Sequence, residues 1–157
     1  MEQRIEQYQQ GYSKLLNEVD GLSEELLLFK PSETSWSIRE IIIHVADAEL
    51  VHIHRMKAVL AEENPILTAF DQELWTDRLH SQQLDHQLYL QLFKSMRESF
   101  LPIIQKLTEQ DYLRIGTHTI AGPQTFKEIL EHSIEHVEGH IGQIRRVKTR
   151  FAEQNRQ

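Results

Sequence analysis

Apolar residues recur every three or four positions along most of the chain, which is the spacing of one face of an α-helix. This spacing predicts four long amphipathic helices, at residues 3–19, 37–60, 81–102 and 125–151. It also predicts two shorter helical segments, at residues 23–29 and 71–79. Polar residues occupy the opposite face of each stretch, so each long helix is expected to bury one side against the others.

Two of the long helices begin with a capping box, in which a Ser or Thr and a Glu three residues later bond to each other's backbone amides. The pairs are Ser37 with Glu40 and Thr125 with Glu128. Pro102 is expected to kink or end the third long helix, because proline lacks an amide hydrogen and clashes with the preceding turn. Residues 108–123, which contain two glycines and a proline, are expected to form a long loop.

Glycine and proline are scarce, which argues against short strands joined by turns. There are 6 glycines and 4 prolines among 157 residues, and neither type occurs within residues 32–64 or 66–101. The sequence therefore predicts an all-α protein, built as a four-helix bundle in a single domain that covers residues 1–157.

Composition excludes several classes of function. The chain has 17 basic and 24 acidic residues, a net charge of −7, which is a poor match for nucleic acid. It has no cysteine, so disulfides, zinc–thiolate sites and a cysteine nucleophile are excluded. No apolar run approaches the roughly 18 residues of a membrane span. We therefore expect a cytoplasmic protein that binds neither nucleic acid nor membranes.

Histidine is the unusual residue, with nine copies in the chain. His132, His136 and His140 lie four apart in the last predicted helix, where a step of four turns only about 40° and rises about 6 Å. An adjacent pair can therefore share one cation, and the spacing allows either 132/136 or 136/140. The alternative to a metal site is that these histidines form a polar stripe on a solvent-exposed helix face.

A third histidine ligand is available from the second long helix. His44 stands in the apolar segment Ile41–Ala46, where burial is costly unless the ring nitrogens find partners. Taken alone, the position of His44 predicts a core histidine that is hydrogen-bonded to a carbonyl or carboxylate. Taken with the later histidines, it predicts a metal site between two helices of the bundle. Three neutral imidazoles leave one position open, which is the layout of a catalytic site.

Two segments carry a resemblance to a known family. Residues 36–49 (WSIREIIIHVADAE) and residues 136–144 (HVEGHIGQI) resemble two signatures of the DinB-like superfamily, which includes YfiT-type metal-dependent hydrolases. The resemblance implies an up-up-down-down bundle, commonly a homodimer, with His44, His136 and His140 as the ligands of one divalent ion per chain. Zinc or nickel is the expected ion, with iron and copper as alternatives.

Other polar residues are candidates for supporting roles. Glu40, Asp47 and Gln143 lie three or four residues from a candidate ligand and could orient an imidazole. His132 and His118 could line the cavity over the metal. His52 and His54 lie too far along the helix to reach the same ion, and solvated or interhelical positions are expected for them.

The resemblance implies an enzyme that acts on a small molecule. The reaction is either hydrolysis by a metal-activated water or transfer to a low-molecular-weight thiol such as bacillithiol. The alternative is a non-enzymatic metal-binding or stress-response module, and a ligand-sized cavity at the open metal position would favour the enzyme. Because free imidazole has a pKa near 6.5, metal is expected to stabilise the fold at pH 7 to 8 and to lose this effect toward pH 5.

Overall fold

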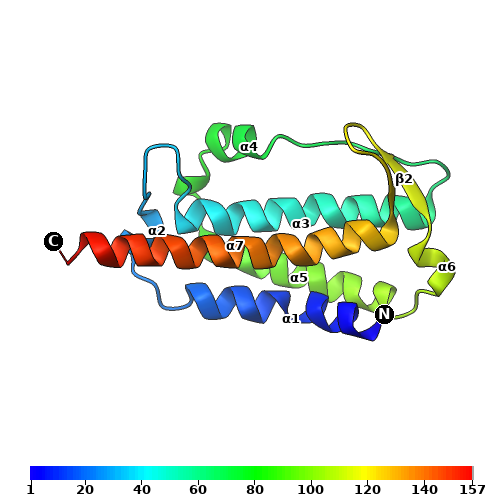
Figure 1. Cartoon of the computed structure of the whole chain (residues 1–157), viewed down its shortest axis with the longest axis horizontal. Coiled ribbons are helices and arrows are strands. Elements are labelled where there is room, and N and C mark those ends of the chain that lie inside the picture. The colour runs from blue at the N-terminus through cyan, green and yellow to red at the C-terminus, as the bar shows by residue number, and fades with distance from the viewer. Residues whose placement is uncertain (157) are drawn as a thin grey trace.

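The computed structural model of the protein describes residues 1–156. Four long helices lie side by side and form a bundle (Figure 1), as the apolar spacing predicts. They are α1 (Glu2–Val19), α3 (Ile38–Ala61), α5 (His86–Ile104) and α7 (Phe126–Gln154). Both capping boxes are present at the predicted positions, at the starts of α3 and α7. The four-helix bundle is thus confirmed.

The directions of the helices differ from the up-up-down-down order that the resemblance implies. Side chains of α1 and α7 form ion pairs whose residue numbers rise together along both helices, from Arg4–Glu131 to Glu18–Arg145. Helix α3 is antiparallel to α7, because His44 approaches His140 whereas Glu49 bonds to Ser133. Helix α5 runs parallel to α3 (Figure 1). The order is therefore up-down-down-up.

The connections explain this order. Residues 20–37 reverse the chain directly after α1 and contain only α2 (Glu24–Leu28). The long crossover is the connection between α3 and α5. It returns the chain along α3, so that α5 begins at the end of the bundle where α3 begins. It contains three short elements: β1 (Ile66–Leu67), α4 (Gln72–Arg78) and the 3₁₀ turn η1 (Ser81–Gln83).

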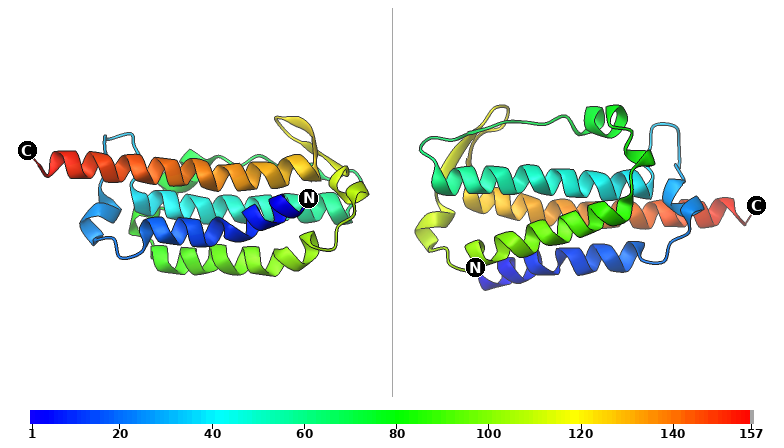
Figure 2. Two further views of the ribbon diagram at one scale, coloured as in Figure 1. Left: turned by 60° about the horizontal axis from the view of Figure 1, so that its bottom comes forward. Right: turned by 180° about the vertical axis from the view of Figure 1, so that it is seen from behind.

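The prediction of a long loop at residues 108–123 is wrong, because this segment contains regular secondary structure. It contains α6 (Glu109–Tyr112) and β2 (Ile115–His118), and β2 pairs with β3 (Gly122–Thr125) and, in parallel, with β1. Position 116 of β2 requires glycine, because a Cβ there would approach Val59 and Leu67 within about 3 Å. The small sheet closes one end of the bundle, away from the C-terminal end of α7 (Figure 2).

The third long helix also departs from its predicted bounds. It begins at His86 after the capping residue Asp85, because His80 adopts a positive φ of 53° and residues 81–83 form only a 3₁₀ turn. It then continues through Pro102 to Ile104. Only Ile103 and Ile104 follow the proline within the helix, so the one hydrogen bond that it removes lies close to the helix end.

The apolar core has two parts. One contains Ile41, Ile42 and Val45 of α3 with Leu90 and Phe93 of α5. The other, nearer the sheet, contains the later residues of α3 and α5, among them Met56, Phe100 and Ile104. Buried polar side chains of α3, α5 and α7 lie between these two parts along the helices. Within residues 1–156, no helix combines the length and the apolarity that crossing a membrane requires.

Candidate metal centre

Three imidazoles meet between α3 and α7. The Nε2 atom of His136 lies 3.0 Å from Nε2 of His44 and 3.1 Å from Nε2 of His140. One ring nitrogen from each of the three residues lies within 4.8 Å of the other two. Because residues four apart lie on one face of a helix, α7 presents His136 and His140 together to His44 of the neighbouring α3.

The protonation of the three rings suits a cation. The side-chain oxygen of Gln143 accepts a hydrogen bond of 2.8 Å from Nδ1 of His140. Nδ1 of His140 therefore carries the proton, and its Nε2 presents a lone pair to the other two rings. Nε2 of His136 faces two other ring nitrogens, and one hydrogen can satisfy only one of them. The cluster is therefore left with lone pairs that a cation can accept.

Burial keeps the three rings neutral. It lowers the pKa of His44 to about 3, with a further contribution from His140. It lowers the pKa of His136 to about 2, with contributions from the neighbouring histidines. The pKa of His140 is lowered as well, mainly by burial, although the bond to Gln143 opposes the shift. Neutral imidazole is the form that binds metals.

Aromatic side chains cover the histidines. The Trp36 ring lies 4.8 Å from the His44 ring and stacks on His140 at 6.2 Å. The Phe70 ring stacks on His44 at 6.3 Å. Neither residue was singled out from the sequence as part of the site. The signal for Trp36 was its position directly before the helix that carries His44, but Phe70 comes from a connection with no periodic pattern.

A groove lies near the three histidines but is lined by none of them; it is linked to them through Phe70, whose ring stacks on His44. Its volume is about 560 Å³, and its walls are mainly apolar. Leu50 and Val51 of α3 line one side, and Phe70 and Trp75 line the other. A volume of this size suits a small molecule.

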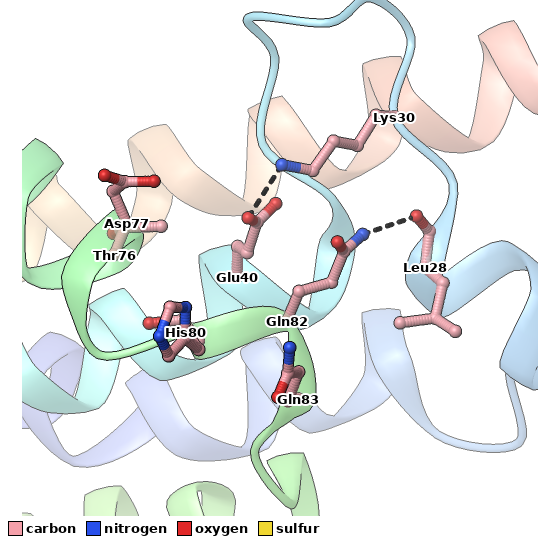
Figure 3. A pocket seen from close by; sticks show the side chains of 9 residues that line it. Leu28, Lys30, Glu40, Thr76, Asp77, His80, Gln82 and Gln83 are labelled. Atoms are coloured by element: carbon pink, nitrogen blue, oxygen red, sulfur yellow. Dashed lines mark hydrogen bonds and ion pairs between the residues drawn. The ribbon is translucent and has the colours of Figure 1, made fainter.

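The two carboxylates expected to orient an imidazole, Glu40 and Asp47, form no hydrogen bond to a histidine of the cluster. Glu40 accepts hydrogen bonds from the Ser37 amide and from Lys30, both at 2.8 Å, so the capping box and this ion pair occupy its oxygens. It faces a separate polar pocket of about 450 Å³ beside η1 (Figure 3). Asp47 is half-buried, which raises its pKa to about 6. Within residues 1–156, the hydrogen bonds of the three imidazoles involve only Gln143 and one another.

The two histidines expected to line the cavity are not members of the three-histidine cluster. The His132 ring lies 6.0 Å from that of His136 and packs edge-on against His52 at 5.2 Å, and the His52 ring lies 5.5 Å from that of His136. His118 lies in β2, where its Nδ1 accepts hydrogen bonds from the amides of Ile120 and Ala121. The interhelical position expected for His52 is present, and its eight-residue spacing from His44 was the signal for it.

Comparison with known proteins identifies the family of this chain. The sequence profile of the DinB superfamily matches residues 7–144. The chain belongs to the DinB superfamily. One relative in the family, from Oceanobacillus iheyensis, bears the name "Putative metal-dependent hydrolase". It is 29% identical over 135 residues, which cover 85% of this chain and 78% of the relative.

Two Bacillus subtilis proteins are also similar. "Putative metal-dependent hydrolase YfiT" is 26% identical over 144 residues, which cover 85% of this chain and 78% of YfiT. YuaE, a protein described as uncharacterized, is 26% identical over 152 residues, which cover 86% of this chain and 91% of YuaE. The similarity therefore extends over most of each protein.

The solved structure of YfiT has the same fold. It superposes with a TM-score of 0.89 over 96% of this chain and 87% of YfiT, at 22% sequence identity. YfiT is described there as having an unusual four-helix bundle topology. The up-down-down-up order found here accords with an uncommon connection of four helices.

Proposed function

We propose that this chain is a metal-dependent enzyme of the DinB superfamily that holds one divalent cation with His44, His136 and His140. The observation that carries the proposal is the convergence of three neutral Nε2 atoms at distances of 3.0 and 3.1 Å. Three protein ligands leave a position free for a reactant, whereas structural sites use four. The relatives named as metal-dependent hydrolases support the same conclusion.

The donor set is the basis for proposing zinc or nickel. Imidazole suits both ions, and iron and copper are the alternatives. A divalent cation at such a site supplies an anionic nucleophile near neutral pH, from water or from a thiol. The residues of the chain prepare the site for this chemistry. Gln143 fixes the tautomer of His140, and the rings of Trp36 and Phe70 stack on His140 and His44.

Hydrolysis of a small molecule is the first candidate reaction, and transfer to a low-molecular-weight thiol is the second. The names of the relatives favour hydrolysis. The thiol reaction is supported by the absence of cysteine, which means that a thiol nucleophile would come from a second substrate. The groove beside Phe70 offers room for that second molecule. We further propose a cytoplasmic homodimer in which each chain is one domain.

Elemental analysis of the purified protein tests the metal centre. The wild-type protein and the control His86→Ala are expected to hold about one divalent ion per chain, whereas His136→Ala is expected to hold none. His86 lies at the start of α5, where its ring forms a hydrogen bond with the neighbouring Gln87. The substitution His86→Ala therefore removes one imidazole, as His136→Ala does, but outside the three-histidine cluster. Equal metal content in His136→Ala and wild type would refute the ligand assignment.

A turnover screen then separates the two reactions from a non-enzymatic module. The metal-loaded protein is assayed with ester and amide substrates in water, and with electrophiles in the presence of added thiol. Turnover that requires thiol would replace hydrolysis with transfer as the assigned reaction. Stoichiometric metal binding without turnover in either assay would leave a metal-binding module as the function.

A further inference from the structure

One buried charge in the bundle has no counter-charge. Arg55 of α3 is only 9% exposed, yet no carboxylate of residues 1–156 forms an ion pair with it. The other buried charged side chains are paired, Glu49 with Arg97 and Glu40 with Lys30. A buried unpaired cation is costly, and its cost is removed when an anion binds.

The guanidinium of Arg55 also has an unused donor. Its Nη2 donates a hydrogen bond of 2.7 Å to the carbonyl oxygen of Thr68, but its Nε is buried without a partner. Arginine binds carboxylate and phosphate through two parallel N–H groups, and a free Nε–H is part of that geometry. The side chain is therefore held at one end and unsatisfied at the other.

Neighbouring histidines add further unused polar atoms. His52, one helical turn before Arg55, is 3% exposed and its Nδ1 has no hydrogen-bond partner. His118 accepts two amide hydrogens at Nδ1, so its proton resides on Nε2, which is then a donor. Arg55 acts electrostatically on both rings and contributes to the lowering of their pKa values. His52 and Arg55 are neighbours on α3, and His118 pairs with Leu67 in the small sheet, next to the Thr68 carbonyl that Arg55 binds, so the three side chains form one corner around the Arg55 charge.

This corner is close to the three-histidine centre. The segment 68–70 contacts both, because the Thr68 carbonyl bonds to Arg55 and the Phe70 ring stacks on His44. Two residues of extended chain span about 7 Å at most. A second link runs through His52, whose ring lies 5.5 Å from that of His136. The corner and the three-histidine centre are therefore neighbours within the bundle.

We propose that Arg55, with donors from His52 and His118, is an anion-binding subsite beside the three-histidine centre. The substrate class is then a small molecule with a carboxylate or phosphate group a short distance from the bond that reacts. This substrate class rests on the proposed function of the three-histidine centre. The binding of an anion by Arg55 does not, because no ligand of that centre takes part in it.

Titration of the full chain with matched probes tests the subsite. The probes are inorganic phosphate and succinate, with succinamide as the neutral control, at a constant ionic strength of about 0.15 M so that surface charges are screened. Thermal stability is measured for the protein as purified and after chelation. We expect phosphate and succinate, but not succinamide, to raise the melting temperature saturably in both preparations.

Substitutions locate the binding. Arg55→Gln is expected to bind succinate about tenfold more weakly or worse, the effect of losing a charged hydrogen-bond donor. The matched control is Arg78→Gln, which removes the same charge from α4 and is expected to bind like wild type. His136→Ala is expected to lose metal and to keep its response to the anion. This separates the subsite from the metal centre.

A spectroscopic measurement on the wild-type protein makes the test independent of how Arg55→Gln folds. The Nε–H resonance of Arg55 is expected to shift saturably with phosphate, whereas that of Arg97, enclosed by its ion pair, is expected to stay. Three outcomes would overturn the subsite. They are no saturable response in wild type, equal affinity in Arg55→Gln, and a response that disappears in His136→Ala because the anion occupied the histidine centre.

Discussion

Two polar clusters are buried in the same bundle, and they differ in how their hydrogen bonds are used. In the first, each long helix contributes one residue: Tyr8, Glu49, Arg97 and Ser133. Glu49 accepts from the Tyr8 hydroxyl at 2.6 Å, and from Arg97 and Ser133 at 3.0 Å. Arg97 also donates to the backbone oxygens of Tyr8 and Ser133. Its charge is compensated within the protein.

The second cluster is not closed in this way. The Nε2 atoms of His44, His136 and His140 face one another, and the acceptor outside the cluster is Gln143. The first cluster therefore ties four helices together, whereas the second keeps its lone pairs available. Burial of polar groups alone does not distinguish a structural cluster from a binding site. They are distinguished by charge and by lone pairs, because Glu49 neutralises Arg97 in the first cluster, whereas ring nitrogens face one another in the second.

The largest effect is expected from breaking the closed cluster. Glu49→Ala leaves the Arg97 charge buried without a partner, and we expect a loss of about 3–5 kcal/mol in the free energy of unfolding. Chemical denaturation measures this loss. The control Glu63→Ala removes an exposed carboxylate just after α3 and is expected to change little. Equal stability of Glu49→Ala and wild type would show that the network is not structural.

A smaller effect is expected from the open cluster, and only when metal is present. At a free metal concentration of one hundred times the dissociation constant, wild-type protein is expected to gain about 2.7 kcal/mol by mass action. His136→Ala is expected to gain nothing. The measurement is thermal unfolding with and without zinc or nickel. A metal-induced gain that survives in His136→Ala would place the cation elsewhere.

The pH dependence sharpens the same comparison. Folded-state pKa values near 3 for His44 and near 2 for His136 lie below the unfolded value of about 6.5. Below pH 6.5 the unfolded chain therefore binds protons that the folded chain excludes. The free energy of unfolding consequently decreases as the pH is lowered, for apo and metal-loaded protein alike. The difference between the two is expected to change less between pH 7.5 and pH 5 than three free imidazoles would require, because His44 and His136 stay neutral.

This result would replace the expectation based on free imidazole, which predicts that the metal-induced gain is lost toward pH 5. Thermal unfolding of both forms at the two pH values measures the difference. A gain that disappears at pH 5 would show that the rings titrate near 6.5 and that the cluster is open to water.

The smallest effect is expected at His132. His132→Ala removes the edge-on contact with His52 but none of the three converging nitrogens. Full metal content is expected, with complete loss in the matched variant His140→Ala, and elemental analysis measures both. Loss of metal in His132→Ala with retention in His140→Ala would show that the 132/136 pair binds the ion.

Much of the bundle could be predicted from local pattern. The capping boxes at Ser37 and Thr125 rest on interactions within four residues, and both form as predicted. The approach of His44 to His136 and His140 followed from two helix faces and from the family signatures. These features depend on short-range periodicity, which a single sequence displays.

The features that sequence missed depend on long-range contacts. Helix direction is set by the connections, so the apolar spacing predicted four helices but not the parallel packing of α3 and α5. The strand that contains Gly116 pairs with β1, a segment about 50 residues earlier, and nothing within residues 108–123 indicates that pairing. The isolation of Arg55 is likewise visible only once the carboxylates have been placed.

The antiparallel packing of α3 and α7 has a consequence for the order of events during synthesis. His44 and His136 are separated by 92 residues. A nascent chain therefore carries His44 long before its partners emerge, and helix α3 alone offers a cation only one of the three nitrogens. Contacts of such long sequence separation form late in folding. Metal capture at the proposed site therefore waits for the docking of the last helix, so an occupied centre marks a chain that has been completed and folded.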